Sequence, residues 1–212
     1  PLLRIGPLCR KHDIWLHVDA ALAGTAALVE EKRHLFEGVE AADSFVFNPH
    51  KWMFTNFDCS AYFVRDVDVL QRTMSTRPEY LKTQHDAVVN NYRDWGIALG
   101  RRFRALKLWF VIRSYGVSGL QKMVRRHLGL AADFAQWIRE NDDWELLAPV
   151  PLNLVCFRFN PQRVTEDEDV LNRLNEKLLG EINRSGLCML THTKLAGRYA
   201  LRLSIGQTYT QK

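Results

Sequence analysis

The sequence predicts an α/β part followed by a smaller α+β part. The apolar runs at 14–19 and 44–48 are continuous rather than alternating, which is typical of strands in a parallel sheet covered on both faces. Strands later in the chain alternate apolar and polar residues nearly regularly, which favours an antiparallel sheet with one solvated face. We therefore place a domain boundary between residues 1–113 and 114–212, where the order of elements changes character.

The first part is predicted to contain the end of a helix, three strands and a short helix. These elements are expected at residues 1–12, 14–19, 44–48, 59–64 and 66–73. A polar, irregular segment follows at 74–95 and contains Pro78 and the pair Asn90-Asn91. A loop of that length in a compact domain is usually functional or disordered, which makes it a candidate functional loop.

The second part begins with helices and continues mainly with strands. Apolar residues recur near helical spacing over 97–115 and again over 117–141, and Gly116 separates the two predicted helices. The remaining predicted elements are strands at 144–147, 154–159, 187–191 and 199–205 and a helix at 167–184.

The composition is that of an ordinary globular protein, because 47% of the 212 residues are hydrophobic and 25% are charged. No apolar run approaches the ~20 residues of a membrane span, and the first residues show no signal-peptide pattern. The cysteines are widely spaced without a CxxC pair, so we expect reduced core residues of a cytoplasmic protein and no metal site. They are Cys9, Cys59, Cys156 and Cys188.

The net charge of +5 is mild, and many basic residues gather in two clusters. The clusters comprise Arg101, Arg102, Arg104, Lys107 and Arg113, and then Arg125, Arg126 and His127. No aromatic strand platform or recognition motif accompanies them. We interpret them as solvated helix faces or subunit contacts and expect no nucleic-acid partner.

The most informative residues are 48–52, Asn-Pro-His-Lys-Trp, which follow the apolar run at 44–47 and place Lys51 on a turn past a strand. The earlier apolar run contains Asp19 near its end. Each residue alone has an ordinary explanation. A strand-end Asp often caps the next helix, a loop Lys is usually solvated, and His50 could be a satisfied loop histidine. Their joint occurrence, in this order, indicates a site.

A strand-end Asp and a strand-end Lys suit the cofactor pyridoxal phosphate (PLP). Lys51 would form a Schiff base with its aldehyde, and Asp19 would hold the proton on its pyridine nitrogen. PLP is a deep electron sink only when that nitrogen is protonated, and a nearby carboxylate favours the protonated form. Small residues beside Asp19 leave room for a flat ring, namely Ala20, Ala21, Ala23 and Gly24.

Longer stretches carry a family resemblance in which both order and spacing fit. They are residues 17–21, 42–45, 48–52, 56–60, 78–82, 92–95 and 100–107. On these residues the chain resembles the C-terminal half of the aromatic-L-amino-acid decarboxylases, which are group II PLP-dependent decarboxylases. The resemblance implies PLP-dependent transferase fold type I (aspartate-aminotransferase-like). The chain would then hold part of the large domain and an incomplete small C-terminal domain.

The resemblance also implies roles for individual residues. Lys51 would be the Schiff-base lysine, and Asp19 would pair with the pyridinium nitrogen. Ala21 would pack against a face of the ring. Asn48 and His50 would contact the cofactor phosphate.

Tyr80, on the expected mobile loop, is similar to the tyrosine that returns a proton to the substrate carbon after carbon dioxide leaves. Relatives with Phe at this position tend to be aldehyde synthases, which react with oxygen, so Tyr80 favours decarboxylation to an amine. The resemblance further implies a homodimer in which this loop reaches the partner subunit's active site. The alternative for Tyr80 is an ordinary loop aromatic.

The resemblance implies decarboxylation of an aromatic L-amino acid to its amine by the full-length dimer. Because the family's N-terminal half is outside these 212 residues, we expect the isolated chain to be an inactive, aggregation-prone fragment. Three alternatives stay open: a decarboxylase of another amino acid, an aromatic aldehyde synthase, and a non-catalytic homologue.

Overall fold

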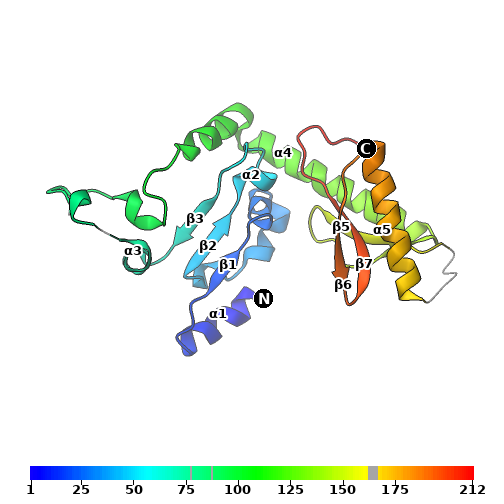
Figure 1. The fold of residues 1–212 in the computed structure, drawn as a ribbon, viewed down its shortest axis with the longest axis horizontal. Helices are drawn as coiled ribbons and strands as arrows, with labels where there is room; N and C mark the ends of the chain where they lie inside the picture. Colours follow the sequence, from blue (N-terminus) through cyan, green and yellow to red (C-terminus); the bar gives the residue numbers. More distant parts are fainter. Residues whose placement is uncertain (77, 87, 162–166) are drawn as a thin grey trace. The chain divides into compact units, whose positions relative to one another are not determined.

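The computed structural model describes residues 1–212 apart from 77, 87 and 162–166. The chain divides into two compact units, residues 1–120 and 121–212 (Figure 1). The division falls within α4 (Arg104–Glu140), whose backbone leaves the helical conformation at Gly116 with φ 64° and ψ 173°. Glycine tolerates a positive φ that other residues rarely adopt, so the predicted helix break at Gly116 is confirmed. The boundary expected at residue 114 lies beside this kink.

The first unit contains three strands between helices. Its elements are α1 (Leu2–Lys11), β1 (His17–Asp19), β2 (Ser44–Phe47), α2 (Pro49–Trp52), β3 (Ala61–Val64) and α3 (Val67–Met74). Between β1 and β2 the chain forms 3-10 helices at Ala23–Leu28, Glu30–Phe36 and Val39–Ala41. The predicted elements of this part are thus present, each within a few residues of its expected bounds.

The sheet of the first unit has the strand order β1-β2-β3. Strands β1 and β2 pair in parallel, with Asp19 beside Val46, whereas β3 runs antiparallel to β2. Tyr62 and Phe63, neighbours on β3, are 48% and 57% exposed. Because successive side chains point to opposite faces of a strand, both faces are open at β3. Cover on both faces was expected for the strands at 14–19 and 44–48. In β1, His17 and Asp19 are exposed and Val18 is half-buried, so among the described residues the expected cover is incomplete there as well.

The prediction of a helix over 97–115 is wrong at its start, because the residues just before α4 are irregular. Helix α4 begins at Arg104, and residues 96–103 are irregular, with a fully extended backbone at Gly96 (φ 176°, ψ 175°). In its described residues, the polar segment before it contains the 3-10 turns η4 (Glu79–Leu81) and η5 (Tyr92–Trp95). The Ser75 hydroxyl donates to Asp94 Oδ1 at 3.1 Å, which ties η5 to the end of α3.

The described residues of the second unit form an antiparallel sheet, the later part of α4 and the helix α5 (Glu168–Ser185). Its strands, in spatial order, are β4 (Trp144–Leu146), β5 (Leu154–Phe159), β7 (Arg198–Ser204) and β6 (Thr191–Leu195). The strand predicted at 187–191 is wrong by several residues. Helix α5 ends at Ser185 and is followed by Gly186 in the left-handed conformation (φ 73°), and strand pairing begins only at Thr191, opposite Arg202.

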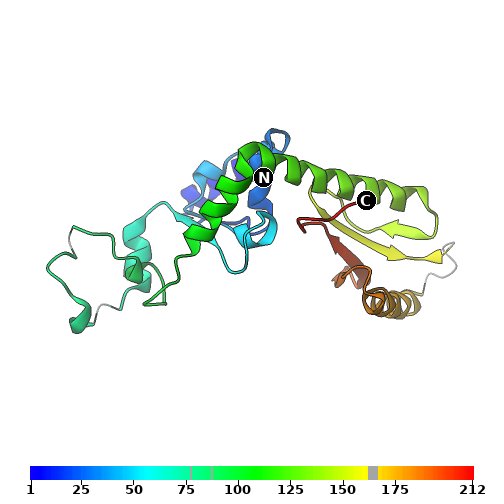
Figure 2. The same ribbon diagram turned by 90° about the horizontal axis from the view of Figure 1, so that it is seen from above.

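Both faces of β5 are covered, which corrects the expectation of one solvated face. Phe157 on one face packs edge-on against Phe134 of α4, with ring centroids 5.1 Å apart. Arg158 points to the opposite face, is 2% exposed, and bonds Glu168 at the start of α5. Figure 2 shows α4 and α5 on opposite sides of this sheet. The sheet with its two helices therefore forms a small three-layer core.

Asn175 of α5 is a fully buried polar link between helix and sheet. Its side-chain NH2 donates to the Phe159 carbonyl at 2.8 Å, and its oxygen accepts from the Phe159 N–H at 2.8 Å. Removing it leaves buried backbone groups without partners, so we expect Asn175→Ala to lower the free energy of unfolding by about 2–3 kcal/mol. Urea unfolding measures this loss. The exposed Lys177→Ala on the same helix should stay within about 0.5 kcal/mol of wild type, and equal effects of both changes would contradict the prediction.

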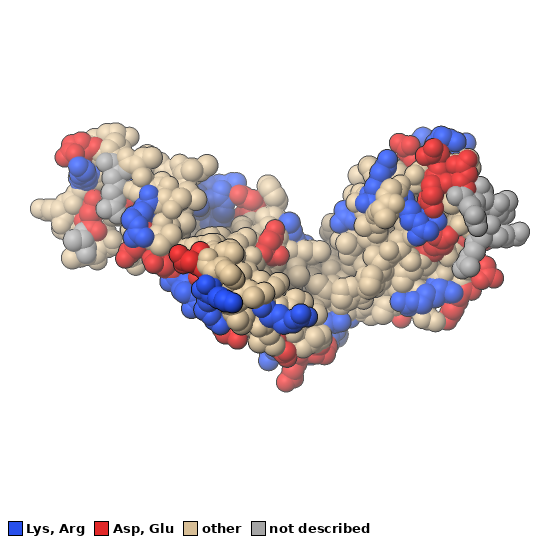
Figure 3. Space-filling view, turned by 90° about the horizontal axis from the view of Figure 1, so that it is seen from below, with Lys and Arg blue, Asp and Glu red and all other residues tan. Residues whose placement is uncertain are grey.

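Contrary to the prediction, the cysteines are not all in the core, and the charged side chains are mixed on the surface (Figure 3). All four cysteines are free thiols, but only Cys59 and Cys156 are buried; Cys9 is half-buried and Cys188 is exposed. On the face drawn in Figure 3, basic and acidic side chains are interspersed rather than gathered in one basic patch. Within the described ranges, no helix is long and apolar enough to cross a membrane.

Candidate active site

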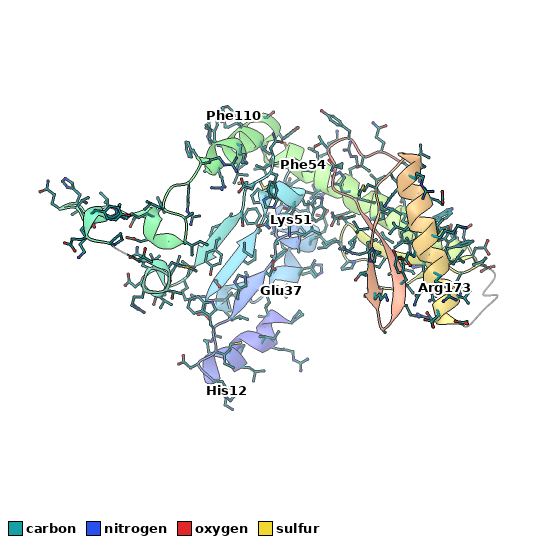
Figure 4. The ribbon with its side chains drawn as sticks, in the orientation of Figure 1. His12, Glu37, Lys51, Phe54, Phe110 and Arg173 are labelled. Carbon is teal, nitrogen blue, oxygen red and sulfur yellow. The ribbon has the colours of Figure 1, made fainter. Side chains whose placement is uncertain are left out.

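The carboxyl ends of β1 and β2 bring Asp19 and Lys51 to the same edge of the sheet. Asp19 is the last residue of β1, and Lys51 lies in the single helical turn α2 directly after β2 (Figure 4). The parallel register, with Asp19 beside Val46, makes the two strand ends neighbours. In open α/β sheets, ligands bind outside such carboxyl ends.

Backbone hydrogen bonds join the two loops that follow these strands. The Ala20 N–H donates to the Val46 carbonyl at 2.9 Å, and the Asn48 N–H donates to the Ala21 carbonyl at 2.9 Å. The second bond lies beyond the last ladder pair, so it fixes the turn carrying Lys51 against the turn after Asp19. Ala21 thus helps to join the two loops through its backbone carbonyl.

Asp19 is not the cap of the following helix. Its Oδ1 accepts the Ala21 N–H at 2.9 Å, which closes a tight turn. The next helical turn starts at Ala23, and the residue at its N-cap is Leu22. The Asp19 side chain is exposed in this chain rather than buried. Its turn fixes one carboxylate oxygen and leaves the group accessible to a ligand.

Turn α2 is anchored by its buried residues while Lys51 stays accessible. Pro49 is buried, Trp52 is fully buried, and the Lys51 side chain is exposed. Pro49 suits the first helical position because its fixed φ matches the helix and the N–H it lacks would have no partner there. The backbone is therefore held by packing on either side of a lysine whose amine is free to react.

Asn48 precedes α2 at the N-cap position but does not cap it with its side chain. Its Oδ1 instead accepts the Ser60 hydroxyl at 2.6 Å. His50 is held similarly by the segment before β3, because its Nδ1 lies 3.0 Å from the Cys59 nitrogen and 2.6 Å from the Cys59 oxygen. The Phe57 ring meets the His50 ring edge-on at 4.9 Å. Because the Cys59 backbone holds Nδ1 in either tautomer of His50, Nε2 is the ring nitrogen that remains available to another partner.

The small residues after Asp19 have a packing role in addition to the expected one. A Cβ on Gly24 would lie 2.4 Å from the Phe47 Cβ, so no larger residue fits without moving the end of β2. We predicted this glycine as room for a flat ring. The structure shows a packing role for it as well, because it allows the chain after Asp19 to cross closely over β2.

Asp58 anchors the segment between α2 and β3 to the start of α4. Its carboxylate accepts from Arg102 and from Arg104, each at 2.8 Å, and Lys107 lies 4.0 Å away. The hydrogen bond from Arg104 holds the pKa of Asp58 below its ordinary value. Part of the first basic cluster is therefore engaged in pairing with this carboxylate.

This anchor predicts a pH dependence of stability. A lowered folded-state pKa means that the contribution is fully present above the unfolded value of about 3.9 and is lost as pH falls through the folded value. We expect Asp58→Asn to be less stable than wild type at pH 7, with the difference shrinking below about pH 4. Urea unfolding across this pH range tests it, with the exposed Asp142→Asn as control. A difference independent of pH would contradict the assignment.

Tyr80 is not brought to Lys51 within this chain. It lies in η4, and its side chain is 79% exposed. Both ribbon views show the segment around η4 projecting away from α2 (Figures 1 and 2). Of the residues predicted for the site, Asp19, Ala21, Asn48, His50 and Lys51 are gathered at one sheet edge, and Tyr80 stands apart.

Three residues of the region were missed as contributors by the sequence reasoning. Asp58 holds the start of α4, the backbone of Cys59 holds His50, and the hydroxyl of Ser60 holds Asn48. The signal was present, because residues 56–60 belong to the stretches that carry the family resemblance. No function could be attached to them before the register of β2 with β3 placed them beside α2.

The donor set at this sheet edge fits PLP. It combines a primary amine, a carboxylate fixed at a strand end, and an amide and an imidazole on the lysine's own turn. These groups match an aldehyde, a pyridinium nitrogen and a phosphate respectively. In the described part of the chain, no group of three or more His, Cys, Asp or Glu side chains could hold a metal ion.

The parallel strand ends with their lysine and carboxylate, and the separate antiparallel unit, are those of a PLP-dependent enzyme of fold type I. The family description "Pyridoxal-dependent decarboxylase conserved domain" matches residues 1–160. The chain belongs to this family, as the resemblance implied.

Three similar proteins illustrate the relationship. Phenylacetaldehyde synthase from a Rosa hybrid cultivar and tryptophan decarboxylase 2 from Oryza sativa subsp. japonica are each 44% identical over all of this chain. The crystal structure of Oryza sativa TDC with PLP and tryptamine superposes on 98% of the chain with a TM-score of 0.90 and 36% identity. The chain spans 43% of each of these three proteins.

Proposed function

We propose that the protein carrying this chain is a PLP-dependent decarboxylase that converts an aromatic L-amino acid to its amine and carbon dioxide. One observation carries the proposal. The N–H of Asn48 binds the carbonyl of Ala21, and this bond holds the lysine turn against the turn after Asp19. Similarity to tryptophan and tyrosine decarboxylases supports the aromatic substrate.

The residues at this sheet edge have distinct roles in the proposal. Lys51 Nζ would hold the cofactor through its aldehyde, and the Asp19 carboxylate would accept a hydrogen bond from the protonated ring nitrogen. Asn48 and His50 would bind the phosphate, and Ala21 would pack against the ring. PLP, when bound, supplies an electron sink that accepts the electrons of the bond to the departing carboxylate.

Tyr80 would return the proton. Its phenol donates to the carbon that has lost carbon dioxide, and the surrounding loop excludes water. Because Tyr80 projects away from Lys51 within its own chain, we propose that it acts at the site of a second copy. The active form is then a homodimer with its active sites at the subunit interface.

Assays of the purified full-length protein that carries this chain, supplied with PLP, test this function directly. We expect carbon dioxide and the matching amine from tyrosine, tryptophan or dihydroxyphenylalanine, and no turnover of glutamate. Borohydride reduction should fix one PLP on Lys51, read out by peptide mass. If PLP binds but glutamate alone is turned over, the substrate assignment is wrong; if no PLP binds, the whole proposal fails.

An aromatic aldehyde synthase is the second candidate, supported by the similarity to phenylacetaldehyde synthase. Such an enzyme converts amino acid, oxygen and water to aldehyde, carbon dioxide, ammonia and hydrogen peroxide. The two candidates are separated by their products, because only the synthase consumes oxygen. Amine without peroxide supports the decarboxylase.

A further inference from the structure

Asn48 is an N-cap residue that does not cap. Asn is favoured before a helix because its side-chain oxygen accepts a free N–H of the first turn. Here α2 receives no such bond, and Asn48 Oδ1 accepts the Ser60 hydroxyl at 2.6 Å instead. The amide oxygen is therefore engaged by a residue outside the turn.

This contact determines which end of the amide is offered to a ligand. A carboxamide is planar, and its accepting oxygen and donating NH2 group diverge from the same carbon atom within that plane. With the oxygen held by Ser60, the NH2 group is directed away from Ser60 and remains available as a donor. A phosphate has only acceptor oxygens at its charged positions, so it requires the NH2 group and is repelled by the oxygen.

From this geometry we infer that Ser60 is a positioning residue for cofactor binding. It fixes the Asn48 amide in the orientation that donates to the PLP phosphate. The inference rests on the proposed function, because it takes PLP as the ligand. The adjacent Cys59 backbone holds His50 Nδ1 in a parallel way, so one short segment before β3 orients both side chains expected at the phosphate.

A thermodynamic cycle tests whether Ser60 acts through Asn48. PLP is titrated into apoprotein prepared from wild type, Ser60→Ala, Asn48→Ala and the double variant, with binding followed by absorbance and fluorescence. Loss of one orienting hydrogen bond should weaken PLP binding about five- to tenfold in Ser60→Ala. In the Asn48→Ala background the same change should have no further effect, since the amide it orients is gone.

Two further measurements separate orientation from a general structural effect. Ser60→Thr keeps the hydroxyl and should restore affinity to within about twofold. The ³¹P resonance of bound PLP should shift in Ser60→Ala, because the donors around the phosphate change, and should return in Ser60→Thr.

The outcomes distinguish the inference from the function on which it rests. If Ser60→Ala binds PLP as wild type does, or loses the same factor in both backgrounds, Ser60 does not act through Asn48. The inference is then wrong while the proposed function stands. If wild type itself binds no PLP, the proposed function fails and takes the inference with it.

Discussion

Lys51→Ala is expected to abolish amine formation, with a loss of at least about a thousandfold. The change removes the amine that attaches the cofactor, and no other group on this turn can form a Schiff base. The Lys51 side chain is exposed, whereas Pro49 and Trp52 anchor the turn, so folding should be preserved. Single-turnover assays and PLP absorbance of the purified variant measure the effect.

Two companion variants sharpen this test. Lys51→Arg keeps the positive charge but not the reactive amine, so it should be nearly as inactive as Lys51→Ala. The exposed Lys11→Ala should behave as wild type in both activity and borohydride trapping. Substantial turnover by Lys51→Ala, or a PLP adduct on another lysine, would overturn the site assignment.

Tyr80→Phe is expected to change the product rather than simply slow the reaction. Without the phenol proton, amine formation should fall about a hundredfold, the usual contribution of a positioned acid. Reaction with oxygen should then yield aldehyde, ammonia and hydrogen peroxide. Chromatographic product analysis with a peroxide assay reports both changes. The matched control is Tyr92→Phe, because Tyr92 is exposed in the neighbouring turn η5.

Mixing two inactive variants tests whether Tyr80 acts on the partner's site. In a dimer of Lys51→Ala with Tyr80→Phe, a loop acting in trans leaves one of the two sites with both groups intact. Random mixing should then restore amine formation to about a quarter of wild type. A loop acting within its own chain restores none, and unchanged amine output by Tyr80→Phe alone would remove Tyr80 from the mechanism.

The fold was predictable wherever local pattern was enough. Strand β5 has the predicted bounds, and Gly116 interrupts α4 as expected, because apolar periodicity and a positive-φ glycine are local signals. The predicted helix start at residue 97 is wrong, because residues 96–103 are irregular and are held in part by the ion pair between Arg102 and Asp58. No spacing rule foresees a partner that distant in the chain.

Part of the candidate site could likewise be predicted from the sequence alone. Asp19 and Lys51 could be picked out from the residue order, because Asp19 ends one apolar run, Lys51 lies on the turn after the next run, and parallel strand ends share one edge. Their chemistry follows from residue type alone, since only an amine and a carboxylate suit an aldehyde and a pyridinium nitrogen.

The contacts that orient the site required three dimensions. Ser60 reaches Asn48, and Cys59 reaches His50, only because β3 turns back antiparallel beside β2. The separation of Tyr80 from Lys51 likewise depends on the course of the backbone after α3. Pattern in one dimension specifies which groups are present and which strand ends carry them. Pairing between distant segments decides how each group is aimed, because hydrogen bonds depend on distance and direction rather than on position in the chain.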